Sequence, residues 1–287
     1  TSAMTGCVAT AMAQILKYFQ YPSSSTGKSY YLFDGSEARH NVTLSTTYDW
    51  ANMANAYTWN YSDAQAKAVQ ELMRDCGYVS HMIYSAQGSG ANAYDAGAGL
   101  SHNMRYDSLA LSVDRRMFYN DEDWMSAIYV ELQNQRPILY NAVDPNMMGH
   151  AFVFDGMDSE GRVHINWGWS GTANGYFDVR DLNGLAPSYP NPYTGTDIKY
   201  NFCDDQIMVR GFKTQETPDA DELYHSYFAM LEPDSIWMDN DSLKLKSVPM
   251  FNFSHLDFTG LIGVVVEDTT GHAVVQPFFY SPWQGGA

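Results

Sequence analysis

The feature that most constrains the fold is a change of hydrophobic pattern near Pro137. Before this proline, apolar residues recur at helical spacing. After it, short runs rich in β-branched and aromatic residues alternate with turns. Helices in the first part of the chain, followed by a meander of strands, predict an α+β domain.

Four helices are expected, over residues 7–19, 62–77 and 92–103, and a fourth that starts at Asn120 or Asp121 and stops before Pro137. The second begins with the capping box Ser62–Gln65, and we expect Gly77 to end it. This pattern places Cys76 on the buried face of the second helix, where we interpret it as a packing residue.

The expected strands of the second part are short and separated by turns. They lie at residues 137–141, 150–156, 162–167, 176–179 and 206–212, with a turn at 158–161. The polar, acidic segment 213–222 predicts a linker. Beyond it, residues 243–253, 261–266 and 273–279 predict further strands and no helix is evident. We therefore predict a domain over 1–212 and a small β-sandwich-like module over 223–287, leaving open whether that module is complete.

Charge and composition exclude several classes of function. The chain carries 33 acidic and 16 basic side chains, a formal charge of −17, and no basic patch for nucleic acid. No run of about 18 apolar residues could span a membrane. Three cysteines cannot form a dense disulfide scaffold. No cysteine or histidine spacing fits zinc, and Asp239–Asp241 lacks the pattern of a calcium loop, so neither a metal nor a cofactor is expected.

The candidate nucleophile is Cys7, in the first turn of the first helix. Unpaired backbone N–H groups and the helix dipole there favour thiolate, so we expect a lowered pKa, and the same groups could hold an oxyanion. Of the eight histidines, His150 is the best candidate base, because it opens a strand and Gly149 before it leaves room for substrate. Asn166 or Trp167, on the next strand, could orient the imidazole. The alternative is that the tryptophans there are core residues.

Three segments carry a family resemblance. Thr5–Tyr18 with Tyr21-Pro22, Gly149–Gly156 and Asn166–Gly171 resemble the nucleophile, histidine and tryptophan segments of the streptopain family of cysteine peptidases, which includes interpain A. Tyr48–Trp50, Glu71–Gly77 and Leu132–Pro137 also fit in order, so the resemblance covers about residues 1–212. The Cys-Gly-Ser-Cys-Trp signature is absent, which argues against the papain family proper.

The resemblance implies a papain-like fold and a bacterial endopeptidase that is secreted or lies at the cell surface or in the periplasm. Such an enzyme is made as a zymogen, inhibited by its own propeptide, and acts on proteins or peptides. By the same resemblance, Cys7 is the nucleophile, His150 the general base, and Trp167 covers the imidazole with Trp169 packed nearby. Gly149 and the loop Ser85–Ala91, which includes Ser89 and Gly90, would line a pocket for a hydrophobic side chain just before the scissile residue.

One departure leaves alternatives open. The family has a glutamine upstream of the nucleophile that completes the oxyanion hole, but none of the six residues before Cys7 is glutamine. Gln14 follows Cys7 and cannot replace it by spacing. We therefore expect a fragment that lacks its propeptide, or one chain of a processed two-chain enzyme. A catalytically silent binding protein on a peptidase scaffold is the alternative from another class, and acyl transfer to an amine or amidase chemistry is a third.

Overall fold

The chain divides into two units, residues 1–224 and 225–287, and each is described here by itself. The computed structural model describes residues 3–57, 60–108, 110–179, 188–190, 197–214, 228–230, 235–239, 242–246, 250–252, 258–267 and 273–283. No helix in these ranges is long and apolar enough to cross a lipid bilayer.

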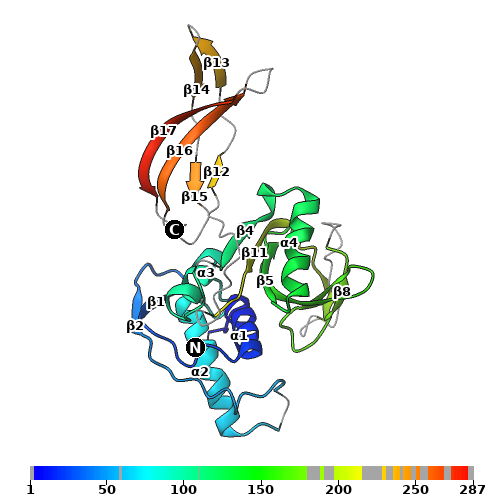
Figure 1. The fold of residues 1–287 in the computed structure, drawn as a ribbon. Coiled ribbons are helices and arrows are strands. Elements are labelled where there is room, and N and C mark those ends of the chain that lie inside the picture. Colours follow the sequence, from blue (N-terminus) through cyan, green and yellow to red (C-terminus); the bar gives the residue numbers. More distant parts are fainter. Residues whose placement is uncertain are drawn as a thin grey trace. The chain divides into compact units, whose positions relative to one another are not determined.

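The first unit combines four helices with a six-stranded antiparallel sheet. The helices are α1 (Cys7–Phe19), α2 (Asp63–Val79), α3 (Ala93–His102) and α4 (Asp121–Gln133), with a 3-10 turn at Arg116–Phe118. The sheet has the order β4 (Ser112–Arg115), β11 (Asp204–Arg210), β5 (Ile138–Val143), β6 (Gly149–Met157), β7 (Val163–Asn166) and β8 (Gly175–Phe177). In Figure 1, α1, α2 and α3 gather on one side of this unit and α4 lies with the sheet on the other.

Two smaller sheets complete the first unit as described. β1 (Lys28–Phe33) pairs with β2 (His40–Thr43) in antiparallel and with β3 (Ile83–Tyr84) in parallel orientation. β9 (Ser188–Pro190) pairs with β10 (Asp197–Lys199). The α+β class predicted for this part of the chain is confirmed.

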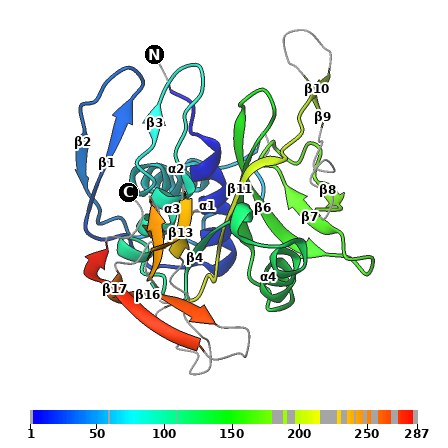
Figure 2. The ribbon, with the colours of Figure 1, turned by 90° about the horizontal axis from the view of Figure 1, so that it is seen from above.

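The large sheet separates two hydrophobic cores. Leu139, Ala151 and Val153 face the core that contains α1, whereas Tyr140 and Phe152 face the core that contains α4. This alternation follows from the period of two of a strand that is covered on both faces. Figure 2 shows β6 and β11 running between α1 and α4. α1 is therefore packed directly against β6, the strand that carries His150.

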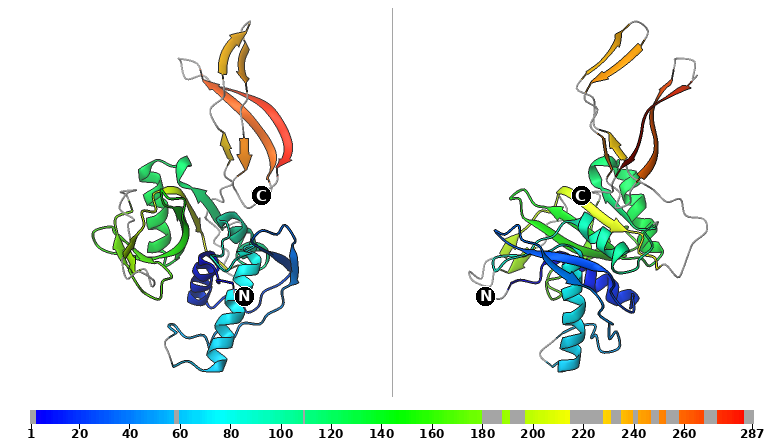
Figure 3. Two further views of the ribbon diagram at one scale, coloured as in Figure 1. Left: turned by 180° about the vertical axis from the view of Figure 1, so that it is seen from behind. Right: turned by 90° about the vertical axis from the view of Figure 1, so that its left-hand side faces the viewer.

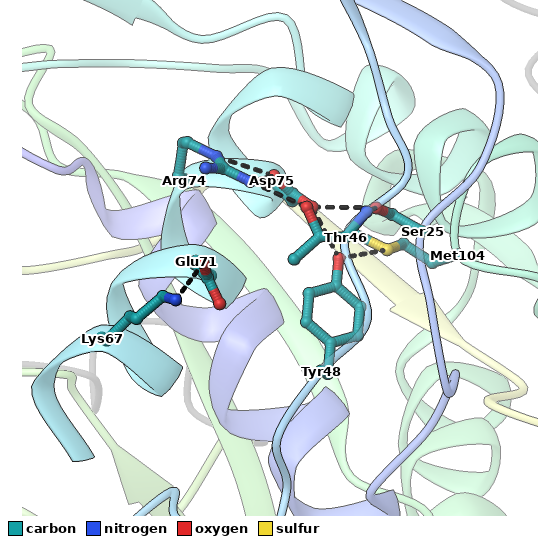
Figure 4. A network of polar contacts seen from close by, with 8 residues as sticks. All are labelled: Ser25, Thr46, Tyr48, Lys67, Glu71, Arg74, Asp75 and Met104. Carbon is teal, nitrogen blue, oxygen red and sulfur yellow. Dashed lines mark hydrogen bonds and ion pairs between the residues drawn. The ribbon is translucent and has the colours of Figure 1, made fainter. Parts of the chain in front are cut away.

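A buried carboxylate ties the residues just before β1 and just after β2 to α2 (Figure 4). Asp75 is fully buried and accepts hydrogen bonds from Ser25 Oγ at 2.8 Å, Tyr48 Oη at 3.1 Å and Arg74 Nε at 2.9 Å. Burial raises the pKa of Tyr48 above its usual range, with the charge of Asp75 as the second cause. Because a buried charge is tolerated only with such partners, the network fixes these residues on α2.

Most predicted elements of the first unit form, with one corrected boundary. α1 begins and ends at the expected residues, and the capping box of Ser62 and Gln65 opens α2. Gly77, however, does not end α2, which continues to Val79. A Cβ at Gly77 would lie 2.1 Å from the hydroxyl of Tyr84, so this glycine permits a close contact rather than a stop. Cys76 is fully buried, as predicted.

Six strands of the first unit were not predicted: β1, β2, β3, β4, β9 and β10. β1 shows no clear alternation of buried and exposed residues, and β3 has only two residues. Strands of this kind lack the period-two signal on which sequence reasoning depends.

The second unit contains three antiparallel pairs of strands among its described residues. They are β12 (Phe228–Met230) with β15 (Met250–Asn252), β13 (Ser235–Asp239) with β14 (Ser242–Lys246), and β16 (Phe258–Glu267) with β17 (Ala273–Trp283). Figure 3 shows the long, twisted pair of β16 and β17 in orange and red. The β-sandwich arrangement stays a prediction, as does the predicted linker. Of the predicted linker, Lys213 and Thr214 lie within the first unit, where they pair with Asp107 and Tyr106, and residues 215–222 lie outside the described residues.

Candidate active site

Cys7 is the first residue of α1, and Gly6 forms the N-cap before it. Gly6 has φ +90°, a conformation that side-chain-bearing residues rarely adopt, and a Cβ here would lie 2.7 Å from the side chain of Met82. The carbonyl of Gly6 accepts hydrogen bonds from the N–H and the hydroxyl of Thr10. The helix start, and with it the thiol, is therefore fixed in one place.

The Cys7 side chain is partly buried, and this reverses one expectation. Burial raises the pKa of Cys7, while hydrogen bonds from the backbone N–H groups of Ala151, Val8 and Cys7 itself lower it by less. The prediction that the helix N-terminus lowers the pKa of this thiol is therefore wrong for this structure. The helix N-terminus acts in the expected direction, but desolvation of the charged form outweighs it.

His150 lies near the start of β6, one residue before Ala151. Its Nε2 is 2.8 Å from the carbonyl oxygen of Trp167. A carbonyl oxygen can only accept, so Nε2 carries the hydrogen and Nδ1 of the neutral ring holds the free lone pair. Burial lowers the pKa of His150 to about 4, and the bond to Trp167 opposes that shift. No direct hydrogen bond joins Cys7 to His150 in the part of the chain that the structure describes.

Aromatic rings surround the imidazole of His150. The ring of Trp169 lies nearly parallel to it, with centroids 4.9 Å apart, and that of Phe202 lies at 5.6 Å. The ring of Trp167 is also nearly parallel but lies farther away, at 6.4 Å, and is fully buried. Trp169 is thus the closer of the two covering tryptophans, whereas the resemblance implied Trp167. Phe202 had no local motif that could have indicated its position.

Among the described residues, the side chain of Asn166 has hydrogen-bond partners other than His150. Its Oδ1 accepts hydrogen bonds from the N–H of Gly168 at 3.1 Å and from Nε2 of Gln14 at 3.4 Å. Of the two residues that the sequence left open as the orienting group, Trp167 contacts the imidazole, and it does so through its backbone. The other histidine of this hairpin, His164, pairs with Asp155.

A cleft of about 490 Å³ opens beside Cys7. Ser89, Gly90 and Gly149, the three residues expected in the substrate pocket, line this cleft together with Cys7. A Cβ on Gly90 or Gly149 would have no atom within 4 Å, so both glycines leave the cleft open. The remaining lining residues are Ala91, Asn92, Ala93, Tyr94, Arg115, Asn141, Asp205 and Ile207.

Sequence reasoning missed the ion pair of Arg115 and Asp205 in this cleft. The two residues lie on the neighbouring strands β4 and β11, far apart in the sequence, so no local pattern links them. Within the described ranges, no group of three or more histidine, cysteine or acidic side chains is arranged to hold a metal ion.

Comparison with known proteins places this geometry in a family. The sequence profile of the peptidase C10 family matches residues 1–177. The chain belongs to the peptidase C10 family. The predicted resemblance to the streptopain family, which includes interpain A, is thereby confirmed, and this is a family of cysteine peptidases.

Solved structures and sequences of C10 relatives agree with this assignment. Active wild-type interpain A cysteine protease of Prevotella intermedia is 39% identical, with a TM-score of 0.63 over 74% of this chain and 84% of that one. A prointerpain A fragment is 37% identical, with a TM-score of 0.62 over 74% and 64% of the two chains.

Two bacterial sequences are similar over part of their length. Streptopain of Streptococcus pyogenes is 35% identical over 191 residues, which cover 64% of this chain and 48% of streptopain. The thiol protease/hemagglutinin PrtT of Porphyromonas gingivalis is 34% identical over 183 residues, 63% of this chain and 21% of PrtT. The match thus spans about half the length of streptopain and about a fifth of PrtT.

Proposed function

We propose that this chain cleaves internal peptide bonds of proteins or peptides through a thioester, with Cys7 as nucleophile and His150 as general base. The observation that carries the proposal is the junction of α1 and β6. There the Cys7 sulfur accepts a hydrogen bond from the backbone N–H of Ala151, the residue after His150. Cys7 also lines an open cleft. The Trp167 carbonyl oxygen accepts a hydrogen bond from Nε2–H of His150, which leaves the basic Nδ1 of the ring available to the thiol.

The reaction proceeds in two steps. The thiol proton of Cys7 passes to Nδ1 of His150 as the sulfur attacks the substrate carbonyl carbon. Backbone N–H groups at the start of α1 stabilise the resulting oxyanion. The tetrahedral intermediate then breaks its C–N bond, and the imidazolium gives its proton to the leaving amine. In the second step Nδ1 takes a proton from water, and the hydroxide attacks the thioester carbonyl carbon. The C–S bond then breaks, and the imidazolium returns its proton to the sulfur of Cys7.

The shifted pKa values indicate a neutral resting pair. Burial favours the thiol form of Cys7 and the neutral form of His150. A lone charge on either group is unfavourable in this site, whereas an adjacent thiolate and imidazolium stabilise each other. We therefore expect the proton to move between them during attack, with the Trp167 carbonyl stabilising the imidazolium through Nε2–H.

A hydrophobic side chain before the scissile residue is the proposed substrate preference. Gly149 ends a turn in which Met147 and Met148 are 83% and 57% exposed. The carboxylate of Asp144 stabilises this turn by accepting hydrogen bonds from the backbone N–H groups of Asn146 and Met148. Within the turn, Met147 has a left-handed backbone conformation, with φ +63°. These exposed methionines directly precede Gly149, which lines the cleft, and flexible methionine side chains suit apolar substrate side chains of varied shape.

The cellular context is proposed from the relatives. We expect export from a bacterial cell, or exposure at its surface or in its periplasm, and synthesis as a zymogen, because prointerpain A is a precursor form of a similar peptidase. The propeptide would then occupy the cleft as an intramolecular inhibitor. A glutamine that completes the oxyanion hole from a preceding segment stays a prediction.

The test is hydrolysis of a fluorogenic peptide by the full chain and by the Cys7→Ala variant. The variant should lose all turnover above background, and His150→Ala should do the same. The matched control is Cys203→Ala, which removes a partly exposed thiol outside the cleft lining and should retain activity. Undiminished cleavage by Cys7→Ala would refute the assignment. Products formed with an added amine would separate hydrolysis from acyl transfer.

A further inference from the structure

Gln14 lies on the face of α1 that carries the nucleophile. Cys7, Thr10 and Gln14 follow one another at positions i, i+3 and i+7, which share one side of a helix. Thr10 and Gln14 both contact the turn Asn166–Gly168. The methyl carbon of Thr10 lies 3.4 Å from the place of a Cβ at Gly168, and Gln14 Nε2 donates to Asn166 Oδ1 at 3.4 Å.

The orientation of the two amides is fixed by the backbone. The N–H of Gly168 donates to Oδ1 of Asn166 at 3.1 Å, and an N–H group requires an acceptor. The atom that Gln14 meets is therefore the oxygen of Asn166, so Gln14 must present its NH₂ group to it. This leaves Oε1 of Gln14 buried, with no protein partner among the described residues.

That buried oxygen makes Gln14 costly for stability. An unsatisfied buried acceptor lowers the free energy of unfolding, a cost that an apolar residue of similar size would avoid. The hydrogen bond to Asn166, at the long end of the usual range, does not offset this cost. Folding alone therefore does not explain a glutamine at this position.

The turn that Gln14 contacts carries the partner of the proposed base. Trp167 lies between Asn166 and Gly168, and its carbonyl oxygen accepts from Nε2 of His150. The direction of that carbonyl depends on how the turn is held. Asn166 closes the turn on one side by bonding the Gly168 N–H, and α1 supports it from the other through Gln14.

We propose that Gln14 is a positioning residue that acts through Asn166 to aim the Trp167 carbonyl at His150. The helix that bears the nucleophile would then also set the direction of the base. This inference rests on the proposed function of Cys7 and His150. Gln14 itself is not among the residues that line the cleft beside Cys7.

The test compares the full chain with its Gln14→Leu variant in peptide hydrolysis. We expect kcat to fall about 3- to 10-fold, the equivalent of one hydrogen bond, with KM unchanged. Asn166→Ala should lower kcat as well, and Gln14→Leu should add nothing in that background. The matched control is Lys17→Ala on the same helix, which loses the bond from Lys17 Nζ to the carbonyl of Trp50 and should keep its kcat.

A second readout does not depend on activity. The Nε2–H proton of His150, observed by NMR, should exchange with solvent faster in Gln14→Leu than in the parent and in Lys17→Ala. Gln14→Met serves the same purpose if the leucine variant does not fold. The inference would be overturned if Gln14→Leu left both kcat and the exchange rate unchanged. It would also be overturned if the fall in kcat of the double variant equalled the product of the falls in Gln14→Leu and Asn166→Ala. Activity in Cys7→Ala would instead refute the proposed function while the exchange measurement still tests Gln14.

Discussion

Acidification is expected to destabilise the first unit through His150. Burial lowers the pKa of this imidazole from 6.5 to about 4. Between these values the unfolded chain binds a proton that the folded chain does not, so stability falls as the pH falls through this window. The difference of about 2.5 pKa units corresponds to about 3 kcal/mol, present in full above about pH 6.5 and lost by about pH 4.

The assay is urea unfolding of two proteins between about pH 7 and about pH 4. Cys7→Ala serves as the parent, which prevents self-cleavage, and Cys7→Ala/His150→Gln is the comparison. Glutamine does not titrate, and its amide can still donate to the Trp167 carbonyl. All other ionisable groups are shared, so the difference in stability between the two proteins isolates His150.

We expect the free-energy difference to change by about 3 kcal/mol across this range, in favour of the glutamine variant at low pH. The control is His102→Gln, which removes an exposed imidazole at the end of α3. A difference between the parent and the His150 variant that stays constant from neutral to acidic pH would refute the reasoning, because His150 would then take up its proton equally in both states.

Three further predictions concern the scaffold and the cleft. Asp75→Ala should lower the free energy of unfolding, measured with urea, by about 3 kcal/mol, because the hydroxyls of Ser25 and Tyr48 lose their acceptor. The control is Lys67→Ala, which removes an exposed ion pair with Glu71 and should cost less than about 1 kcal/mol. Gly6→Ala should lower both the melting temperature and kcat, since its φ is unfavourable for alanine and its Cβ would clash; unchanged values would contradict this. Replacing Met147 and Met148 by serine should reduce the preference for leucine over alanine before the scissile residue about 3- to 10-fold in kcat/KM, and an unaltered ratio would remove these methionines from substrate recognition.

The regular part of the first unit could be predicted because its signals are local. The apolar spacing in α1, the capping box of α2 and the turn between β6 and β7 each lie within a few residues of the element they define. The position of β11 between β4 and β5 could not be predicted. It joins strands far apart in the sequence, and no pattern within a strand records its neighbour.

The energetics of the candidate site could not be predicted from the sequence. Cys7 and the three residues expected in the pocket line one cleft, and their roles stay a prediction. The direction of the Cys7 pKa shift was wrong, because the helix start is visible in the sequence while the desolvation of the thiol depends on β6 packed against it. The contact of Gln14 with Asn166 could not be predicted either, since the two residues are 152 positions apart in the sequence.

The partner of His150 is a main-chain oxygen, and this affects how the protein can evolve. A side-chain acceptor can be lost in a single codon change, but every amino acid at position 167 would still carry a carbonyl group. Substitution there can alter the packing of the indole without deleting the acceptor itself. Mutations can therefore remove the hydrogen bond between His150 and the Trp167 carbonyl only by moving that carbonyl, through insertions, deletions or changes in neighbouring residues that alter the backbone path.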